Sequence, residues 1–568
     1  MSTKRLQEFF PRVKLDKILK AIPFIGLDIE GIDSQNVRIE YNPNRPDFSS
    51  QYGIVRALKG LLEIEVGLPN FELTKSKRYV IKVDEGIKRL RPYIVSLVAT
   101  RKQHLADEEI RDLIGMQEDL HNGIGRGRKK ASIGMHDLDK ISFPLAYTSV
   151  DKNFSFAPLG KKENYTIVQI LEELETGLEY GHIVKDKERY PIIVDSDNTV
   201  LSFPPIVNSD ATKISTDVKN IFVEITANNK RTAQDTIAII AMNLFDAGFN
   251  IQPVIIYDSI TENKELTPLM EPTSIQVDPN YINQVIGLNL NTKEITSCIL
   301  KSRLGVVHNS AENGRIMCTV PKYRTDIFHQ IDIVEEAVVG YGVFNLQPTL
   351  PWSKTPGKKS DLTLLFNAVR EILTGLGLLE VLSFSLIGKK VEYELVGLKD
   401  NIKQAIIVEG TKSTEYEVLR ESLIPSLLYT LSHNIHEVYP QKIFEIGKVF
   451  TLTEFTKEHW NIGAAIAHNL ATYTEAKSVL QELLNECFSA QQTITISTPA
   501  THNDMYIDGR CANILSNEKK VGVIGEIAPL CLENFKLRVP VVAFELNVSY
   551  LLSKTRTPKN GIRKTTFS

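Results

Sequence analysis

A proline-rich stretch beyond the middle of the chain most constrains the fold, because it divides the sequence into two parts. Residues 347–357 read QPTLPWSKTPG, and prolines with a closing glycine oppose both helix and strand formation. We therefore predict a linker there. A chain of 568 residues is also too long for a single hydrophobic core, and at roughly 100–200 residues per domain it should form about three to five domains.

Helical and strand-like periodicities alternate on both sides of this linker, which predicts a multidomain α/β and α+β fold. Helix signals lie at residues 53–64, 108–121 and 233–247, and strand signals at 93–100 and 221–225. We predict an N-terminal α/β domain (1–80), a larger α/β domain (85–265), a small helix–strand module (267–348) and a last domain of helices and antiparallel strands (358–555). The basic tail at residues 554–568 is expected to be disordered.

Composition excludes several classes of protein. The 66 Lys and Arg residues against 69 Asp and Glu give a net charge of -3, which excludes nucleic-acid binding through global charge and leaves a local basic patch possible. The five cysteines show neither paired zinc-ligand spacing nor an even number, so we expect reduced thiols. No apolar run approaches the roughly 18 residues of a membrane span, and the N-terminus lacks a signal core. These features predict a cytoplasmic protein without a membrane segment.

The densest candidate site is the segment YRTDIFHQIDIVEE, residues 323–336. If Asp332 begins a helix, Glu335 and Glu336 lie at i+3 and i+4 on its face, and Asp326 in the preceding turn can reach the same end. Four carboxylates there would form a hard-oxygen site suited to Mg²⁺. The same spacing is also typical of acidic residues that only cap a helix and stabilise its dipole. Spacing alone leaves both interpretations open.

Two further segments are ambiguous. In HNGIGRGRKK, residues 121–130, the glycines imitate a phosphate loop, but they follow a helix and no Lys-Ser/Thr pair follows, so a nucleotide fingerprint is not indicated. The loop could meet RNA phosphates or simply be solvated. His136, beside Asp137 and Asp139, could be an acid/base or metal cluster, or a turn with capping carboxylates.

Several motifs occur in a fixed order, and together they are more specific than any one alone. They are NRPD with GIVRA (44–47 and 53–57), PKYRTDI with EE and YG (321–327, 335–336 and 341–342), LRESLIP (419–425) and FEIG (444–447). In this order they resemble the β subunits of phenylalanyl-tRNA synthetases over nearly the whole chain. The chain is too short for the inserted oligonucleotide-binding barrel and the anticodon-binding domain of bacterial β subunits, so the resemblance is to the archaeal/eukaryotic type.

The resemblance implies roles for particular residues. Asp326, Asp332, Glu335 and Glu336 are expected to coordinate Mg²⁺ near a partner subunit. The domain at residues 85–265 is expected to hydrolyse tRNA mischarged with tyrosine, which makes it a tRNA-editing domain.

Within that domain, three residues are candidates for the editing pocket. Glu224 and Thr226 are expected to recognise the tyrosine hydroxyl, because a site built to bond a hydroxyl strongly rejects an analogue lacking it. Asn208 is a candidate for positioning the attacking water.

The last domain resembles a class II synthetase catalytic fold that has lost its chemistry. After the expected strand at residues 541–547 there is no Gly-x-Gly-x-x-Arg to hold ATP phosphates. The resemblance implies that ATP and phenylalanine bind to the α subunit of an (αβ)₂ heterotetramer that charges tRNA(Phe). The apolar face of Leu362, Leu365, Phe366, Val369 and Leu373 is either an intersubunit surface or an ordinary core face.

Two alternatives from other classes remain. One is a stand-alone editing hydrolase that needs no partner. The other is a non-enzymatic RNA-binding scaffold, for which the basic residues at 126–130 are the direct support.

Overall fold

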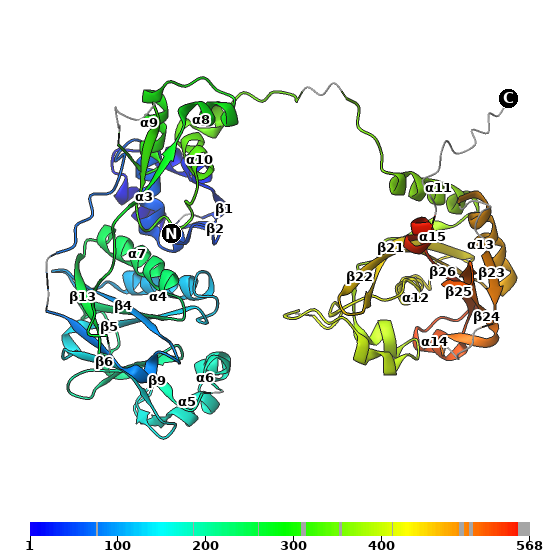
Figure 1. The fold of residues 1–568 in the computed structure, drawn as a ribbon, viewed down its shortest axis with the longest axis horizontal. Helices are drawn as coiled ribbons and strands as arrows, with labels where there is room; N and C mark the ends of the chain where they lie inside the picture. The colour runs from blue at the N-terminus through cyan, green and yellow to red at the C-terminus, as the bar shows by residue number, and fades with distance from the viewer. Residues whose placement is uncertain are drawn as a thin grey trace. The chain divides into compact units, whose positions relative to one another are not determined.

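The computed structural model describes residues 1–554 except 34, 75, 77, 186, 260, 308–313, 352–354, 412, 488–493 and 499–503. The chain forms two compact units, Met1–Leu350 and Pro351–Ser568, so the division falls inside the proline-rich stretch (Figure 1). Part of the predicted linker and the predicted disordered tail from residue 555 lie outside the described residues. The finer domain boundaries stay predictions.

The first unit begins with a small helical layer and a hairpin. Its core joins apolar side chains of helices α1 (Thr3–Phe9), α2 (Leu15–Ala21) and α3 (Gln51–Leu61), beside strands β1 (Leu27–Ile32) and β2 (Val37–Tyr41). The helix predicted from residue 53 begins earlier, because the Ser50 hydroxyl accepts a hydrogen bond from the backbone N–H of Tyr52 and caps the helix.

A ten-stranded mixed sheet forms the middle of the first unit, in the order β11-β10-β9-β6-β3-β13-β4-β12-β5, with β14 beside β13. Its strands are β3 (Val80–Val83), β4 (Tyr93–Thr100), β5 (Ala131–Asp137), β6 (Leu145–Val150), β9 (Tyr190–Val194), β10 (Val200–Phe203), β11 (Val207–Asn208), β12 (Asn220–Ala227), β13 (Asn250–Asp258) and β14 (Lys264–Thr267). The strands predicted at 93–100 and 221–225 are confirmed as β4 and as the middle of β12.

Helices α4 (Asp107–Asn122) and α7 (Lys230–Asp246) cover one face of β4, β5 and β12 (Figure 1). Apolar residues of these helices and strands form one buried core. On the other side, α5 (Ile167–Glu173) and α6 (Glu175–Tyr180) contribute to a smaller core with β9 and β10. The opposite face of β12 carries Phe222, which joins a separate core with β3, β4, β6 and β13. Glu224 and Thr226 lie on this same face, because side chains alternate along a strand.

The first unit ends in a helix–strand module. A three-stranded sheet of β15 (Thr273–Val277), β17 (Ile316–Val320) and β16 (Gly305–Val307) packs against α8 (Pro279–Ile286), α9 (Thr292–Lys301) and α10 (Gln330–Tyr341). The expectation that Asp332 begins a helix is wrong by two residues. Asp332 Oδ2 accepts hydrogen bonds from the backbone N–H groups of Phe328 and His329 at 2.7 and 2.8 Å, so it caps α10 from inside the first turn.

The second unit is built on a seven-stranded sheet in which every neighbouring pair except β18 and β21 is antiparallel. The order is β18 (Leu379–Glu380), β21 (Gln441–Leu452), β22 (Thr456–Ala467), β26 (Val541–Asn547), β25 (Lys519–Ile527), β24 (Tyr506–Ser516) and β23 (Ile494–Ser497). Separate cores form with α11 (Asp361–Gly375), α13 (Tyr473–Cys487) and α15 (Val548–Lys554), and with α12 (Ile424–His433) and α14 (Pro529–Asn534).

Two sequence interpretations are decided here. Phe366, Val369 and Leu373 of α11 are buried in the core of the second unit, so this apolar face is an ordinary core face. Across the described residues, no helix combines the length and the apolar character needed to span a bilayer.

Candidate functional site

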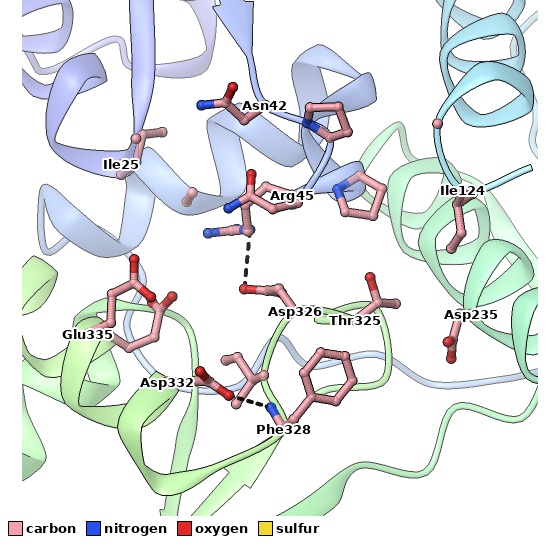
Figure 2. Close-up of a pocket in the computed structure, with 18 of the residues that line it drawn as sticks. Ile25, Asn42, Arg45, Ile124, Asp235, Thr325, Asp326, Phe328, Asp332 and Glu335 are labelled. Atoms are coloured by element: carbon pink, nitrogen blue, oxygen red, sulfur yellow. Dashed lines mark hydrogen bonds and ion pairs between the residues drawn. The ribbon is translucent and has the colours of Figure 1, made fainter. Parts of the chain in front are cut away.

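A cavity of about 960 Å³ opens in the first unit where several segments distant in sequence meet. The loop at residues 42–46, the turn at 325–328 and helix α10 form much of its wall, together with the start of α7 and the loop that follows α4. Figure 2 shows Arg45 facing Asp326 across this cavity, with Asp332 and Glu335 on the side of α10.

Two loops that each carry an Arg-x-Asp sequence meet at the cavity. Arg45 donates from Nε and Nη2 to the two carboxylate oxygens of Asp47, both at 2.9 Å. Arg324 donates in the same way to Asp326, at 2.9 and 2.7 Å. Both are bidentate pairs, the strongest geometry for such contacts. Arg45 Nε also lies 4.0 Å from Asp326, so the two Arg-x-Asp loops form one network.

The network continues into the surrounding helices. Arg56 of α3 lies 3.7 Å from Asp47, forms an ion pair with Asp246 of α7 and stacks over the Tyr323 ring at 4.1 Å. Arg324 also pairs with Glu336 of α10. These charges are largely buried, and removing one partner of such a pair leaves the other charge buried and unpaired. The network therefore fixes the N-terminal layer, α7 and α10 relative to one another.

All four predicted metal ligands line this cavity, but they differ in their contacts. Arg324 occupies both oxygens of Asp326 and one of Glu336, and one oxygen of Asp332 caps α10. The Glu335 carboxylate has no hydrogen bond or ion pair to another described residue. Burial and the nearby carboxylates of Glu336, Asp326 and Asp332 raise the pKa of Glu335.

This arrangement fits a divalent cation only in part. Within the described ranges, no group of three or more His, Cys, Asp or Glu side chains is gathered as a ready metal site. Arg324 bonds two of the four carboxylates, so an excess of negative charge remains around Glu335. A hydrated Mg²⁺ needs only one or two direct carboxylates, which Asp332, Glu335 and Glu336 can supply with their remaining oxygens.

A second, smaller cavity of about 290 Å³ lies between α4, β10 and β12. Glu224 of β12 forms part of its wall and is only 2% exposed. Its Oε1 accepts a hydrogen bond from the Ser202 hydroxyl at 2.9 Å, whereas Oε2 has no partner among the described residues. Burial raises the pKa of Glu224 to about 7. A buried acceptor without a partner is costly, and a ligand hydroxyl would satisfy it.

The other predicted pocket residues differ in position. Asn208 of β11 lines the same cavity. Thr226, two residues after Glu224 on β12, does not line this cavity. Its hydroxyl is instead hydrogen-bonded with Arg91 Nε and Ser132 Oγ, both at 2.9 Å. Arg91 is buried, and burial lowers its pKa to about 10. The prediction missed Arg91 and Ser202, since neither stands in a motif.

His136 is placed close to Glu224 rather than in a surface cluster. Its Nδ1 is 2.9 Å from the Thr212 hydroxyl, its Nε2 has no partner among the described residues, and burial lowers its pKa to about 3. A Cβ atom added at Gly134 would lie 2.4 Å from Glu224 Oε1 and 2.7 Å from His136 Nε2. The nearby Asp137 accepts from the backbone N–H of Asp139, so the capping interpretation holds for that turn.

Basic residues of the loop after α4 line both cavities. Arg126 and Lys130 line the larger cavity. Arg128 points to the smaller one, donating to Ile206 O and to Glu118 Oε1, both at 3.0 Å, and lying 4.2 Å over the Tyr180 ring. Arg128 therefore anchors the loop beside the smaller cavity through its side-chain contacts.

Comparison with known proteins gives consistent matches along the chain. Three family models match: the B3/4 domain at residues 76–246, the tRNA synthetase B5 domain at 275–343 and the phenylalanyl tRNA synthetase beta chain CLM domain at 346–548.

Among curated proteins, a phenylalanine–tRNA ligase beta subunit from Archaeoglobus fulgidus is 38% identical, with 94% of this chain and 95% of the relative covered. One from Methanosarcina acetivorans is 35% identical over 95% and 96%. Among solved structures, an N-terminal fragment of the phenylalanyl-tRNA synthetase beta subunit from Pyrococcus horikoshii matches with a TM-score of 0.57 and 32% identity, covering 60% of this chain and 98% of the fragment.

Proposed function

The chain belongs to the phenylalanine–tRNA ligase β subunits, and we propose that it acts in the cytoplasm with an α subunit as an (αβ)₂ heterotetramer. The complex attaches phenylalanine to tRNA(Phe) using ATP and releases AMP and diphosphate. The sequence after β26 supports this division of labour, because it contains no Gly-x-Gly-x-x-Arg motif of the kind expected to hold ATP phosphates. Binding of ATP and phenylalanine is therefore assigned to the α subunit.

Aminoacylation assays on α, β and the co-expressed pair test this proposal. We expect phenylalanylation by the pair alone. Activity of β alone would overturn the assignment of the chemistry to α. A β chain that clears Tyr-tRNA(Phe) at full rate and binds no α subunit would instead favour the stand-alone hydrolase.

We further propose that this chain hydrolyses Tyr-tRNA(Phe) in the cavity containing Glu224. The observation that carries the proposal is the partnerless Oε2 of this buried carboxyl group. A tyrosine hydroxyl would bond it, whereas phenylalanine would leave it unpaired, and such sites discriminate by up to about 10⁴–10⁵-fold. Ser202 orients the carboxyl group, and Asn208, which lines the same cavity, would hold the attacking water.

Deacylation of Tyr-tRNA(Phe) by the purified complex tests the editing proposal. We expect Glu224→Ala to slow hydrolysis by at least about 100-fold. The variant loses a hydrogen bond to a carboxyl group and leaves the tyrosine hydroxyl of the substrate without a partner. Phenylalanylation should not change. Glu163→Ala, at an exposed glutamate of the same unit, is the matched control. Unchanged hydrolysis in Glu224→Ala would assign recognition to another residue.

We also propose that Mg²⁺ binds at the α10 wall of the larger cavity. Asp332, Glu335 and Glu336 would hold it, and Asp326 could join only by giving up its bonds to Arg324. The ion would neutralise the carboxylates where the partner subunit approaches. Elemental analysis of the complex tests the site: Glu335→Gln should lose bound Mg²⁺, and Glu163→Gln should keep it. Equal metal content in the two variants would overturn the assignment.

A further inference from the structure

The smaller cavity has room for only one end of its proposed substrate. Its volume of about 290 Å³ lies near the lower end of the range of about 300–1,000 Å³ for pockets that hold one drug-sized molecule. The RNA attached to a tyrosyl ester must therefore continue outside this cavity. The loop between α4 and β5 offers a path, because Arg128 lines the smaller cavity whereas Arg126 and Lys130, two residues to either side, line the larger one. Two residues span at most about 7 Å, so the two cavities lie close together across this loop.

Backbone contacts hold this loop in one conformation. Lys130 N donates to Gly125 O at 2.8 Å, and Asn228 N donates to Lys130 O at 3.0 Å. A Cβ atom added at Gly125 would lie 2.6 Å from His121 O, so the turn requires glycine. Arg126 has a positive φ of 53°, a strained value for a residue with a side chain, and such strain clusters at functional sites. The loop therefore presents its cations from a fixed backbone.

The cations of this loop that line the larger cavity have no protein partner. Arg126 and Lys130 are exposed, and neither side chain forms a hydrogen bond or ion pair with another described residue. Arg231, at the start of α7, also lines the cavity with a side chain that is 67% exposed, and it pairs with Asp235 at 3.5 Å. Lys322 pairs with the same carboxylate at 2.8 Å, so Asp235 does not neutralise Arg231 fully. An excess of positive charge follows.

An exposed aromatic ring adjoins these cations. Phe328 is 52% exposed and lines the larger cavity, and the guanidinium carbon of Arg231 lies 5.1 Å from the centre of its ring. Proteins that bind single-stranded RNA combine cations for the phosphates with aromatic or guanidinium planes on which unstacked bases stack. The three cations and Phe328 provide both kinds of contact within one cavity.

The charges around the larger cavity are divided between two sides. Figure 2 shows Ile124 of the loop and Asp235 of α7 on one side, and Asp332 and Glu335 of α10 on the other. The cations of the loop and of α7 therefore lie apart from the two carboxylates that have no ion pair among the described residues. A phosphate is attracted to the first side and repelled by the second, which confines RNA to the side of the loop and α7.

We propose that the three cations and Phe328 bind the single-stranded 3′ end of tRNA and lead it across the α4–β5 loop into the smaller cavity, an inference that rests on the proposed hydrolysis of Tyr-tRNA(Phe). Arg126 and Lys130 bond the phosphates, and Phe328 with Arg231 stacks a base. No covalent bond changes at this surface. It therefore sets the affinity for Tyr-tRNA(Phe) in editing and leaves the rate of hydrolysis of the bound ester unchanged.

Single-turnover deacylation of Tyr-tRNA(Phe), measured over a range of concentrations of the αβ complex, tests the role of the loop cations. For the double variant Arg126→Ala and Lys130→Ala, we expect the half-maximal concentration to rise by about 10-fold or more, with an unchanged maximal rate. The slope of log affinity against log salt concentration should fall in magnitude by about 1.4, because each phosphate contact on a single strand contributes roughly 0.7. The double variant Lys152→Ala and Lys162→Ala is the matched control, since both lysines are exposed and line neither cavity.

The same assay tests the aromatic ring. Phe328→Ala should raise the half-maximal concentration by about 5–100-fold, the usual effect of losing one stacked base. Phe328→Tyr keeps the ring and should match the wild type. Phenylalanylation should keep its KM for tRNA in all variants, because the 3′ end then lies in the α subunit.

Four outcomes would overturn the inference. An unchanged half-maximal concentration and salt slope in the Arg126 and Lys130 double variant would overturn it alone. An equal rise of KM in phenylalanylation would assign the cations to the body of the tRNA, and loss of the α subunit would assign them to a protein interface. No hydrolysis by the wild-type complex would overturn the editing proposal, and this inference with it.

Discussion

The two cavities of the first unit differ in how their charged groups are satisfied. Around the larger cavity, Arg45, Arg56 and Arg324 pair with the buried carboxylates of Asp47, Asp246, Asp326 and Glu336. In the smaller cavity, Glu224 Oε2 and the nearby His136 Nε2 have no partner among the described residues. Paired buried charges hold segments of the chain together. A buried polar atom without a partner destabilises the fold, and a bound ligand can supply the missing hydrogen bond. The smaller cavity is therefore the better candidate for substrate recognition, although its residues gave the weaker signal in the sequence.

The comparison predicts its largest effect on stability at Arg324. Replacing Arg324 by Met would leave Asp326 and Glu336 without their shared cation, and breaking a buried pair costs about 3–5 kcal/mol. Urea unfolding of the full chain, monitored for the transition of the first unit, measures the loss.

Arg111→Met provides the control for this variant. Arg111 pairs with Asp107 on the surface of α4 and is 75% exposed, so its loss should change stability by less than about 1 kcal/mol. Equal effects of the two substitutions would contradict a structural role for the network.

The second prediction concerns Glu224 and pH. Its pKa is about 7 in the folded chain against an ordinary value of 4.5, so the folded state keeps a proton that the unfolded state releases. The free energy of unfolding should therefore fall as pH rises from about 4.5 to about 7, by roughly 3 kcal/mol, and then level off. Glu224→Gln should lack this fall.

Urea unfolding of both proteins at pH 5 and pH 8 tests this sign. The stability gained by Glu224→Gln should be larger at pH 8. Glu392 in the second unit has a pKa raised by burial to about 8 and contributes equally to both proteins, so the difference isolates Glu224. A gain that is larger at pH 5 would contradict the prediction.

The smallest expected effect tests whether Thr226 takes part in recognising the tyrosine hydroxyl. Thr226→Val removes the hydroxyl that accepts from Arg91 Nε and should cost about 1–3 kcal/mol of stability. Because Thr226 does not line the cavity, discrimination between Tyr-tRNA and Phe-tRNA should persist in the folded variant. Thr226→Ser keeps the hydroxyl and serves as the control. Loss of discrimination in Thr226→Val with stability unchanged would restore the sequence interpretation.

Local pattern was sufficient to predict many elements of secondary structure. The strand at residues 93–100 follows from a short apolar run, which the structure buries on both faces. The helices near α4 and α7 follow from apolar residues at helical spacing. The order of the motifs also identified the family. Boundaries were less certain: α10 begins two residues before Asp332, since a carboxylate can cap from within the first turn.

Only the tertiary structure decided which candidate residues share a site. Glu224 and Thr226 project from the same face of β12, yet one reaches a cavity and the other is bonded to Arg91, which is distant in sequence. The sequence does not distinguish the four carboxylates of residues 326–336 from one another. In the structure Arg324 pairs with Asp326 and Glu336, whereas Glu335 has no partner among the described residues. The sequence by itself determined which chemical groups are available and which local elements carry them. Burial and long-range partners determined which groups stay charged and which remain open to a ligand, because both depend on contacts between segments far apart in the chain.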